Sequence, residues 1–322
     1  MKSVLCFGEA LLVVVPESQG PLADVRGFQL QVAGAELNTA VGLSRLQIPS
    51  EFAGSVGADA LGDKVVKTLR AEGVGTSLLE QSPDAPSPLF VKERLGLSPQ
   101  THVYYYRNQS PMAKGWWKAE SSLKEALNQR FSWGHTTGIT WALGERCQDT
   151  AARLLQGLHR AGTKTSFDIN MRLKMQPVSE WKNILKAVLP WCDWIFLSDE
   201  EAELLLAEGD AVAVERQLRD QGFKGQGIVL KAGDKGAWAS VQGQRESVAA
   251  WPGVRVVDTV GAGDGFNAGF IAAQLRELSL AQSLRLGALI GAYAVTVAGD
   301  FEGYPTWEAA SMDLQGAAKG LR

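Results

Sequence analysis

The sequence predicts an α/β protein in which helices cover both faces of a mostly parallel central sheet, with a small β lid inserted into it. Three observations lead to this fold class. Strand-like runs alternate with helix-like runs for most of the 322 residues. Two segments, 12–32 and 88–107, interrupt the alternation. A glycine-rich turn at 258–270 stands between a β-branched run and an apolar run of small residues.

The alternation can be followed along the chain, because strands favour β-branched and aromatic residues while helices repeat apolar residues every three to four positions. The expected strands cover residues 4–7, 51–56, 165–169, 194–197, 228–231, 237–241 and 254–257. The expected helices cover residues 35–46, 59–72, 180–189, 199–207, 268–275 and 284–298. The strands at 228–231 and 237–241 flank a glycine-rich turn and are predicted to pair as a hairpin.

The second interrupting segment favours a hairpin with strands at 89–95 and 101–107 around a turn at 96–100. Side chains alternate along a strand, so its odd and even positions face opposite ways. One face of the second strand would carry Val103, Tyr105 and Arg107, and the other His102, Tyr104 and Tyr106.

These segments divide the chain into two parts. The lid is expected to comprise 12–32 and 88–107, and the α/β body to comprise 1–11, 33–87 and 108–322. An edge hairpin without a lid role is the alternative interpretation.

Composition excludes several classes of protein. Hydrophobic residues make up 45% and charged residues 21% of the chain, as in ordinary globular proteins. A net charge of −3 with scattered basic residues does not predict nucleic-acid binding. Three widely spaced cysteines argue against a disulfide framework or a structural zinc site and favour a cytoplasmic protein. No apolar run approaches membrane-spanning length, and the short N-terminal one meets Glu9, which favours a strand over a signal peptide.

The turn at 258–270 carries the strongest chemical signal. Gly261 and Gly263 allow a sharp turn that exposes backbone N–H groups, and the helix that follows offers its N-terminus to an anion. Asp264 lies where these groups converge. Its carboxylate is either a helix cap or a general base, and the second interpretation suits phosphoryl transfer to a hydroxyl group.

Generic nucleotide motifs are absent. The sequence has no P-loop pattern and no protein-kinase motif set, and Phe266 stands where the dinucleotide pattern would need its last glycine. A hydride-transfer enzyme is therefore disfavoured, and a phosphate site must be of another type.

Residues 258–270 resemble the C-terminal signature of the ribokinase-like carbohydrate kinases. Companion motifs of that family follow in order at 8–9, 33–38, 54–62 and 230–236. The resemblance implies a three-layer αβα ribokinase-like body and an ATP- and Mg²⁺-dependent kinase of a small alcohol. It implies catalytic roles for Gly261, Ala262, Gly263 and Asp264. It also allows K⁺ activation, and it implies a homodimer formed through the β lid.

Two positions depart from the family pattern. Ala33 replaces the usual first glycine of the sugar motif. Residues 198–201, Ser-Asp-Glu-Glu, stand where the family often has Asn-x-x-Glu. By resemblance Glu201 would support Mg²⁺ through water, whereas a solvated helix face is the alternative.

The substrate is expected to be a sugar acid. Arg107 on the lid strand and Arg172 after the strand at 165–169 could each bind a carboxylate, although surface ion pairs would also explain them. Residues 35–38, 104–107, 137–140, 168–172 and 299–303 together are similar to the 2-keto-3-deoxygluconate kinase branch of the family.

The similarity to this branch implies a set of binding residues and a reaction. The implied substrate residues are Gly34, Asn38, Tyr105, Arg107, Arg172, Asp264 and Asp300. The implied ATP residues are Asn170, Arg172, Lys231, Gly233, Asp234, Gly236, Gly261 and Gly263. The reaction would transfer phosphate from ATP to the 6-hydroxyl of 2-dehydro-3-deoxy-D-gluconate, a step of Entner–Doudoroff-type catabolism. The alternatives are a kinase of 2-keto-3-deoxygalactonate or fructose, and a catalytically silent nucleotide- or sugar-binding regulator.

Overall fold

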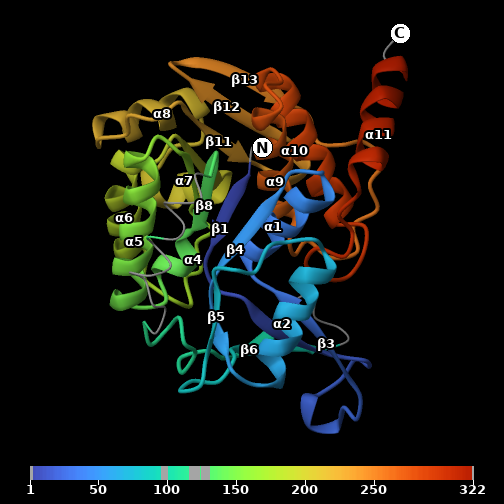
Figure 1. The fold of residues 1–322 in the computed structure, drawn as a ribbon. Helices are drawn as coiled ribbons and strands as arrows, with labels where there is room; N and C mark the ends of the chain where they lie inside the picture. The colour runs from blue at the N-terminus through green and yellow to red at the C-terminus, as the bar shows by residue number, and fades with distance from the viewer. Residues whose placement is uncertain (1–2, 96–100, 116–123, 125–130, 321–322) are drawn as a thin grey trace.

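A nine-stranded sheet forms the centre of the molecule in the computed structural model, which describes residues 3–95, 101–115, 124 and 131–320 (Figure 1). Its strands lie in the order β13 (Gln244–Val248), β12 (Ala237–Val241), β11 (Gly227–Lys231), β10 (Trp194–Ser198), β9 (Lys164–Asp168), β8 (Trp133–Thr137), β1 (Val4–Phe7), β4 (Ser50–Gly57) and β5 (Leu79–Ser82). All neighbours from β5 to β11 pair in parallel, and β12 and β13 add an antiparallel edge. The predicted mostly parallel sheet and the hairpin at its edge are therefore confirmed.

Helices cover both faces of this sheet, and β1 shows why. Val4 and Cys6 belong to one hydrophobic core cluster, whereas Leu5 and Phe7 belong to a second. Alternate side chains point to opposite faces, so a strand that is apolar throughout needs cover on both. Figure 1 shows α5 to α8 on one side and α1, α9 and α10 on the other.

The helices are α1 (Ala35–Arg45), α2 (Ala60–Ala71), α4 (Gly138–Trp141), α5 (Glu145–Arg160), α6 (Val178–Val188), α7 (Asp199–Leu206), α8 (Ala211–Asp220), α9 (Ala262–Leu275), α10 (Leu280–Ala294) and α11 (Trp307–Gly320). Short 3₁₀ turns occur at Leu22–Asp24, Leu189–Trp191 and Gly233–Lys235. Within the described parts of the chain, no helix combines the length and apolarity needed to cross a membrane.

The two segments that interrupt the alternation contribute to a second, four-stranded sheet. Its order is β3 (Phe28–Ala33), β2 (Leu11–Pro16), β6 (Leu89–Arg94) and β7 (Thr101–Tyr106). Strands β2 and β6 are parallel, and the two outer pairs are antiparallel. The turn predicted at 96–100 lies outside the described residues.

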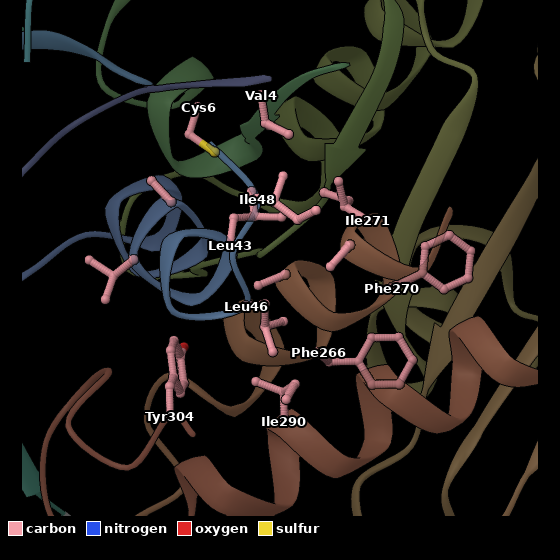
Figure 2. Close-up of a cluster of buried hydrophobic side chains, with 14 of the residues drawn as sticks. Val4, Cys6, Leu43, Leu46, Ile48, Phe266, Phe270, Ile271, Ile290 and Tyr304 are labelled. Carbon is pink, nitrogen blue, oxygen red and sulfur yellow. The ribbon is translucent and has the colours of Figure 1, made fainter. Parts of the chain in front are cut away.

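Helix α9 is anchored in the larger core, which fixes the position of its N-terminus. Figure 2 shows Phe266, Phe270 and Ile271 of α9 beside Leu43 and Leu46. Burying each such side chain contributes about 1.5–3 kcal/mol. Glycine at position 269 lets α10 approach closely, because a Cβ there would lie 2.8 Å from the carbonyl oxygen of Leu286.

Two sequence predictions in this region need correction. Residues 254–257 do not form a strand, and Val256 and Val257 are exposed; the N–H of Val257 donates to the carbonyl of Val295 outside any sheet. Their β-branched side chains suit a strand, but the backbone has no strand edge to pair with. Helix α9 begins at Ala262 rather than at 268, so Gly263 and Asp264 belong to its first turn.

Candidate active site

A cavity of about 540 Å³ lies between the ends of the parallel strands and the second sheet. The strand ends contribute Glu9 after β1, Ile139 after β8, Asp168 of β9, Ser198 of β10 and Lys231 of β11. The second sheet contributes Phe90, Lys92, Val103 and Tyr105. In the central nine-stranded sheet, β4 and β8 lie on opposite sides of β1, which creates a switch in strand order. Open α/β sheets bind ligands at such a switch.

The glycine turn at the start of α9 forms one wall of the cavity. Gly261 has a φ of 77°, and a Cβ there would overlap the carbonyl oxygen of Asp300, so the turn requires glycine. The hydroxyl of Tyr304 donates to the carbonyl of Gly261 at 2.6 Å and holds the turn in place. The first N–H groups of an α-helix lack partners within the helix, so this wall is suited to an anion.

Asp264 lies in this first turn, is buried and lines the cavity. Its Oδ2 accepts from Nδ2 of Asn38 at 2.8 Å, and its Oδ1 from Nδ2 of Asn170 at 3.2 Å. Burial raises the pKa of Asp264 to about 7; the negative charge of Asp168 adds to the rise, while the Asn38 bond opposes it. A carboxyl group with this pKa can accept a proton near neutral pH, which is what a general base requires.

Asn38 also connects Asp264 to Asp300. Its Nδ2 lies 3.3 Å from Oδ2 of Asp300, and burial raises the pKa of Asp300 to about 6, against the opposing charge of Lys92. Oδ1 of Asn38 and Oδ1 of Asp300 are buried and have no hydrogen-bond partner among the described residues. Buried polar atoms are normally paired, so these two oxygens are candidate acceptors for hydroxyl groups of a ligand.

The opposite half of the cavity is organised around Asp168. Its Oδ2 accepts from Nζ of Lys231 and from Nδ2 of Asn267, both at 2.6 Å. Its Oδ1 is buried without a partner among the described residues. Asn170 and Arg172 follow on the same loop, and the positive charge of Arg172 opposes part of the rise that burial causes in the pKa of Asp264.

Glu201 lines the cavity beside Asp168, in the first turn of α7. Its Oε1 accepts from the N–H of Met171 at 2.6 Å, and its Oε2 from the N–H of Ser198 at 2.8 Å in a capping box. Burial and the charge of Asp168 raise the pKa of Glu201. Glu201 is therefore a buried residue of the cavity wall rather than part of a solvated helix face.

Arg107 follows the last residue of β7 and is nearly buried, with its Nη2 2.5 Å from Oε2 of Glu9. Tyr105 is 44% exposed at the cavity edge, and its ring centre lies 5.7 Å from Cζ of Arg107. Gly34 lies at the N-terminus of α1 with a φ of 148°, and a Cβ there would overlap the carbonyl oxygen of Glu9.

The structure brings most of the predicted site residues together. The cavity is lined by Gly34, Asn38, Tyr105, Arg107, Asn170, Arg172, Glu201, Lys231, Gly233, Gly261, Gly263, Asp264 and Asp300. Three predicted residues are not among its lining. Ala262 is the first residue of α9, Asp234 is exposed in a 3₁₀ turn, and Gly236 packs against the backbone of β13.

Sequence reasoning missed several residues that line the cavity. Asp168 could have been identified by its position at the carboxyl end of a parallel strand. Lys92 and Phe90 share the cavity face with Val103 and Tyr105 because Phe90 pairs with Tyr105 and Lys92 with Val103, a register that the sequence does not specify. Within the described residues, no group of three His, Cys, Asp or Glu side chains could hold a metal ion without other ligands.

This arrangement can bind a polar ligand and transfer a charged group to it. Asp264 and Asp300 offer acceptors for hydroxyl groups, the start of α9 offers donors for an anion, and Lys92, Arg107 and Arg172 supply positive charge. Asp264 and the N–H groups suited to an anion lie on the same first turn of α9. A hydroxyl group activated by Asp264 would therefore face an anionic group bound by these N–H groups.

Comparisons with known proteins agree with this chemistry. A family model described as "pfkB family carbohydrate kinase" matches residues 1–307. A 2-dehydro-3-deoxygluconokinase of Bacillus subtilis is 32% identical over 309 residues, covering 94% of this chain and 92% of the relative. A 2-dehydro-3-deoxygalactonokinase of Haloferax volcanii is 27% identical, covering 92% of each chain.

The fold has close structural neighbours. The crystal structure of a putative ribokinase II from E. coli, solved in complex with ATP and Mg²⁺, has a TM-score of 0.86 at 22% identity and covers 98% of this chain and 100% of its own. The predicted ribokinase-like fold is therefore confirmed. The family model spans residues 1–307, and the relative from Bacillus subtilis is 32% identical over 94% of the chain, so the chain belongs to the PfkB family of carbohydrate kinases and is a sugar-phosphorylating enzyme of that family.

Proposed function

We propose that this carbohydrate kinase uses ATP and Mg²⁺ to phosphorylate the 6-hydroxyl of 2-dehydro-3-deoxy-D-gluconate. The observation that carries the proposal is Asp264, a buried carboxyl group with a pKa of about 7 at the start of α9, in a cavity that also contains Lys92, Arg107 and Arg172. A base beside an anion site suits a kinase, and the cationic residues suit a substrate with a carboxylate.

In this proposal Asp264 takes the proton of the terminal hydroxyl group of the sugar. The hydroxyl oxygen attacks the terminal phosphoryl group of ATP, and ADP leaves. Asn38 and Asn170 hold its two oxygens, so the carboxylate is oriented before the substrate arrives. The N–H groups around Gly261 and Gly263 stabilise negative charge that develops on the transferring phosphoryl group. Asp300 and Asn38 bind hydroxyl groups of the sugar.

The nucleotide would lie along the half of the cavity that contains Asn170, Lys231 and Gly233. The neighbour of known structure that was solved with ATP and Mg²⁺ supports this use of the fold. Oδ1 of Asp168 and the carboxylate of Glu201 are buried oxygens in this half, and oxygen ligands suit hydrated Mg²⁺. When bound, Mg²⁺ would neutralise phosphate charge. K⁺ activation stays a further expectation.

The buried guanidinium group of Arg107 favours a sugar acid over a neutral sugar as the substrate. Nε of Arg107 is buried and has no hydrogen-bond acceptor among the described residues. A guanidinium group with unused N–H groups is suited to a carboxylate. The relative from Bacillus subtilis, whose name specifies this sugar acid, supports the same choice. The galactonate epimer and fructose stay alternatives.

The second sheet is proposed to act as the lid of the cavity and as a dimer interface. Leu30, Val14, Val91 and Tyr104 are aligned across its four strands, on the face opposite Phe90 and Tyr105. Leu30, Tyr104 and the nearby Tyr106 are exposed, and an exposed apolar sheet face favours association with a second copy. Size-exclusion chromatography with light scattering tests this: Tyr104→Glu should convert a dimer into a monomer.

A coupled ADP-release assay tests the catalytic proposal. The purified protein is offered 2-dehydro-3-deoxygluconate, its galactonate epimer, fructose, ribose and adenosine, each with ATP and Mg²⁺. We expect the highest kcat/KM with the gluconate derivative. Turnover of a neutral sugar with none of the acids would reject the assignment. Nucleotide binding without ADP formation on any substrate would favour a silent regulator.

A further inference from the structure

We propose that Glu9 is a positioning residue for the sugar: its buried carboxylate holds Arg107 and joins the chain crossings between the body and the second sheet. This inference rests on the proposed function, because it takes Arg107 to bind the sugar substrate. Glu9 is 2% exposed, lines the cavity and contacts groups that no other carboxylate there contacts among the described residues.

Glu9 lies where several crossings meet, which are the chain segments that connect the body to the second sheet. It stands between β1 of the body and β2 of the second sheet. Arg107 directly follows β7, where the chain leaves the second sheet, and Ser110 comes three residues later. Gly34 joins β3 to α1 of the body, and its φ of 148° places it against the backbone carbonyl of Glu9. Two crossings that are distant in sequence therefore contact the crossing that carries Glu9.

The two carboxylate oxygens of Glu9 contact different residues. Oε1 accepts from the hydroxyl of Ser110 at 2.9 Å, and Oε2 lies 2.5 Å from Nη2 of Arg107. Nη2 is thus ion-paired with Glu9, whereas Nε has no hydrogen-bond acceptor among the described residues, so the edge that Nε and Nη2 share keeps N–H groups for a ligand. Nη1 of Arg107 faces the sulfur of Met175 at 3.8 Å.

These contacts leave one edge of the guanidinium group for a ligand. Arg107 is 8% exposed and lines the cavity, so its unused N–H groups cannot be satisfied by bulk solvent. Buried donors of this kind normally have a partner, and an oxygen of the sugar would supply it. Because Glu9 already fixes the guanidinium group, little side-chain entropy is lost when the sugar binds.

Removing the charge of Glu9 should therefore weaken sugar binding rather than phosphoryl transfer. A buried guanidinium group that loses its counter-ion is uncompensated and moves toward water. Arg107 would then present the wrong edge to the sugar. An interaction made equally in the ground state and the transition state changes KM and leaves kcat nearly constant.

The test compares Glu9→Gln with Glu215→Gln. Glu215 is a matched control, since it is also a buried glutamate, 2.5 Å from an arginine nitrogen of Arg219 and 2.5 Å from a serine hydroxyl, but it lies on α8 away from the cavity. For Glu9→Gln we expect the KM for the sugar to rise about tenfold or more, with kcat and the KM for ATP within about twofold of wild type. Glu215→Gln should lower the melting temperature without changing the KM for the sugar.

Three results would overturn the proposal: an unchanged sugar KM in Glu9→Gln, a lowered one, or an equal rise in Glu215→Gln. If Glu9→Gln does not fold, Glu9→Asp replaces it, because it keeps the charge but withdraws the carboxylate; its sugar KM should rise at least about threefold, and no change would reject the role. The assay uses whichever sugar the wild type phosphorylates best. Turnover of fructose alone would therefore reject the proposed substrate and still test Glu9. If no sugar is phosphorylated, calorimetric sugar affinity replaces KM.

Discussion

Two buried aspartates on opposite sides of the cavity differ in what holds them. Asp168 accepts from the ammonium group of Lys231 and from Asn267, whereas the side chain of Asp264 accepts, among the described residues, only from the amides of Asn38 and Asn170. Both side chains are at least nine-tenths buried and both line the cavity. The difference lies in the partner: one carboxylate has a cation within hydrogen-bonding distance, and the other has neutral donors.

This difference separates a carboxylate tied to a cation from one that is held by neutral donors and can act as a base. The ammonium group of Lys231 lies 2.6 Å from Oδ2 of Asp168 and ties this side chain to β11. Neutral amides orient Asp264 but offset its burial only in part, so its pKa rises to about 7. A general base must gain and lose a proton near neutral pH, so the aspartate without a direct cation is the one suited to catalysis.

The largest expected effect follows from Asp264→Asn. The amide keeps the size of the side chain and can still accept from Asn38, but it cannot take a proton from the sugar. We expect kcat to fall by about 10³–10⁴-fold. ATP affinity, measured by calorimetry, should stay close to that of wild type. A loss of less than about tenfold in kcat would mean that Asp264 is not the base.

The second prediction concerns the partner of Asp168. Lys231→Met removes the cation that pairs with the buried Asp168, which should disturb the nucleotide half of the cavity. We expect kcat/KM for ATP to fall about 10- to 100-fold, with a smaller change in the KM for the sugar. Lys235→Met is the control, because Lys235 pairs with Asp199 on the surface of the same loop. Equal losses in both variants would contradict this division of the cavity.

The regular parts of the fold and the base were predictable from sequence because their signals are local. Alternating apolar runs identified the strands and helices of the body, and the glycines around Asp264 identified the turn. The strand predicted at 254–257 was wrong because propensity does not supply a pairing partner. Asp168 lies at the end of the strand that precedes Asn170 and Arg172, so its position points to the cavity as theirs does.

Contacts between distant segments were not predictable in this way. Lys92 reaches the cavity because β6 pairs with β7 in one particular register, and a one-residue shift would turn it to the other face. The pair between Glu9 and Arg107 joins residues 98 positions apart that meet only when both sheets have formed. Their sequence neighbours carry no sign of it, since either residue alone would fit an exposed loop.

The third prediction tests the pKa of Asp264 directly. Catalysis needs the ionised form, so kcat/KM for the sugar should fall about tenfold for each pH unit below about 7 and be level above it. Stability changes with pH in the opposite direction: because the pKa of Asp264 is raised in the folded state, the stability of the wild type falls as pH rises from the usual aspartate pKa of 3.8 to about 7. Asp264→Asn should therefore gain thermal stability relative to wild type between pH 5 and pH 8. An unchanged difference in melting temperature would contradict the raised pKa.

The smallest expected effect concerns Glu201, another buried carboxylate of the cavity, whose oxygens are held by the backbone N–H groups of Met171 and Ser198. In Glu201→Gln, one of these N–H groups would face an amide NH₂. We expect a loss of about 1 kcal/mol in stability and a rise of about fivefold in the Mg²⁺ concentration for half-maximal activity. Gln282→Ala removes the equivalent residue from the capping box of α10, away from the cavity. It should reproduce the loss of stability without the Mg²⁺ effect. If both variants leave the Mg²⁺ requirement unchanged, Glu201 is a helix cap only, and Asp168 alone contributes a buried carboxylate oxygen to the metal.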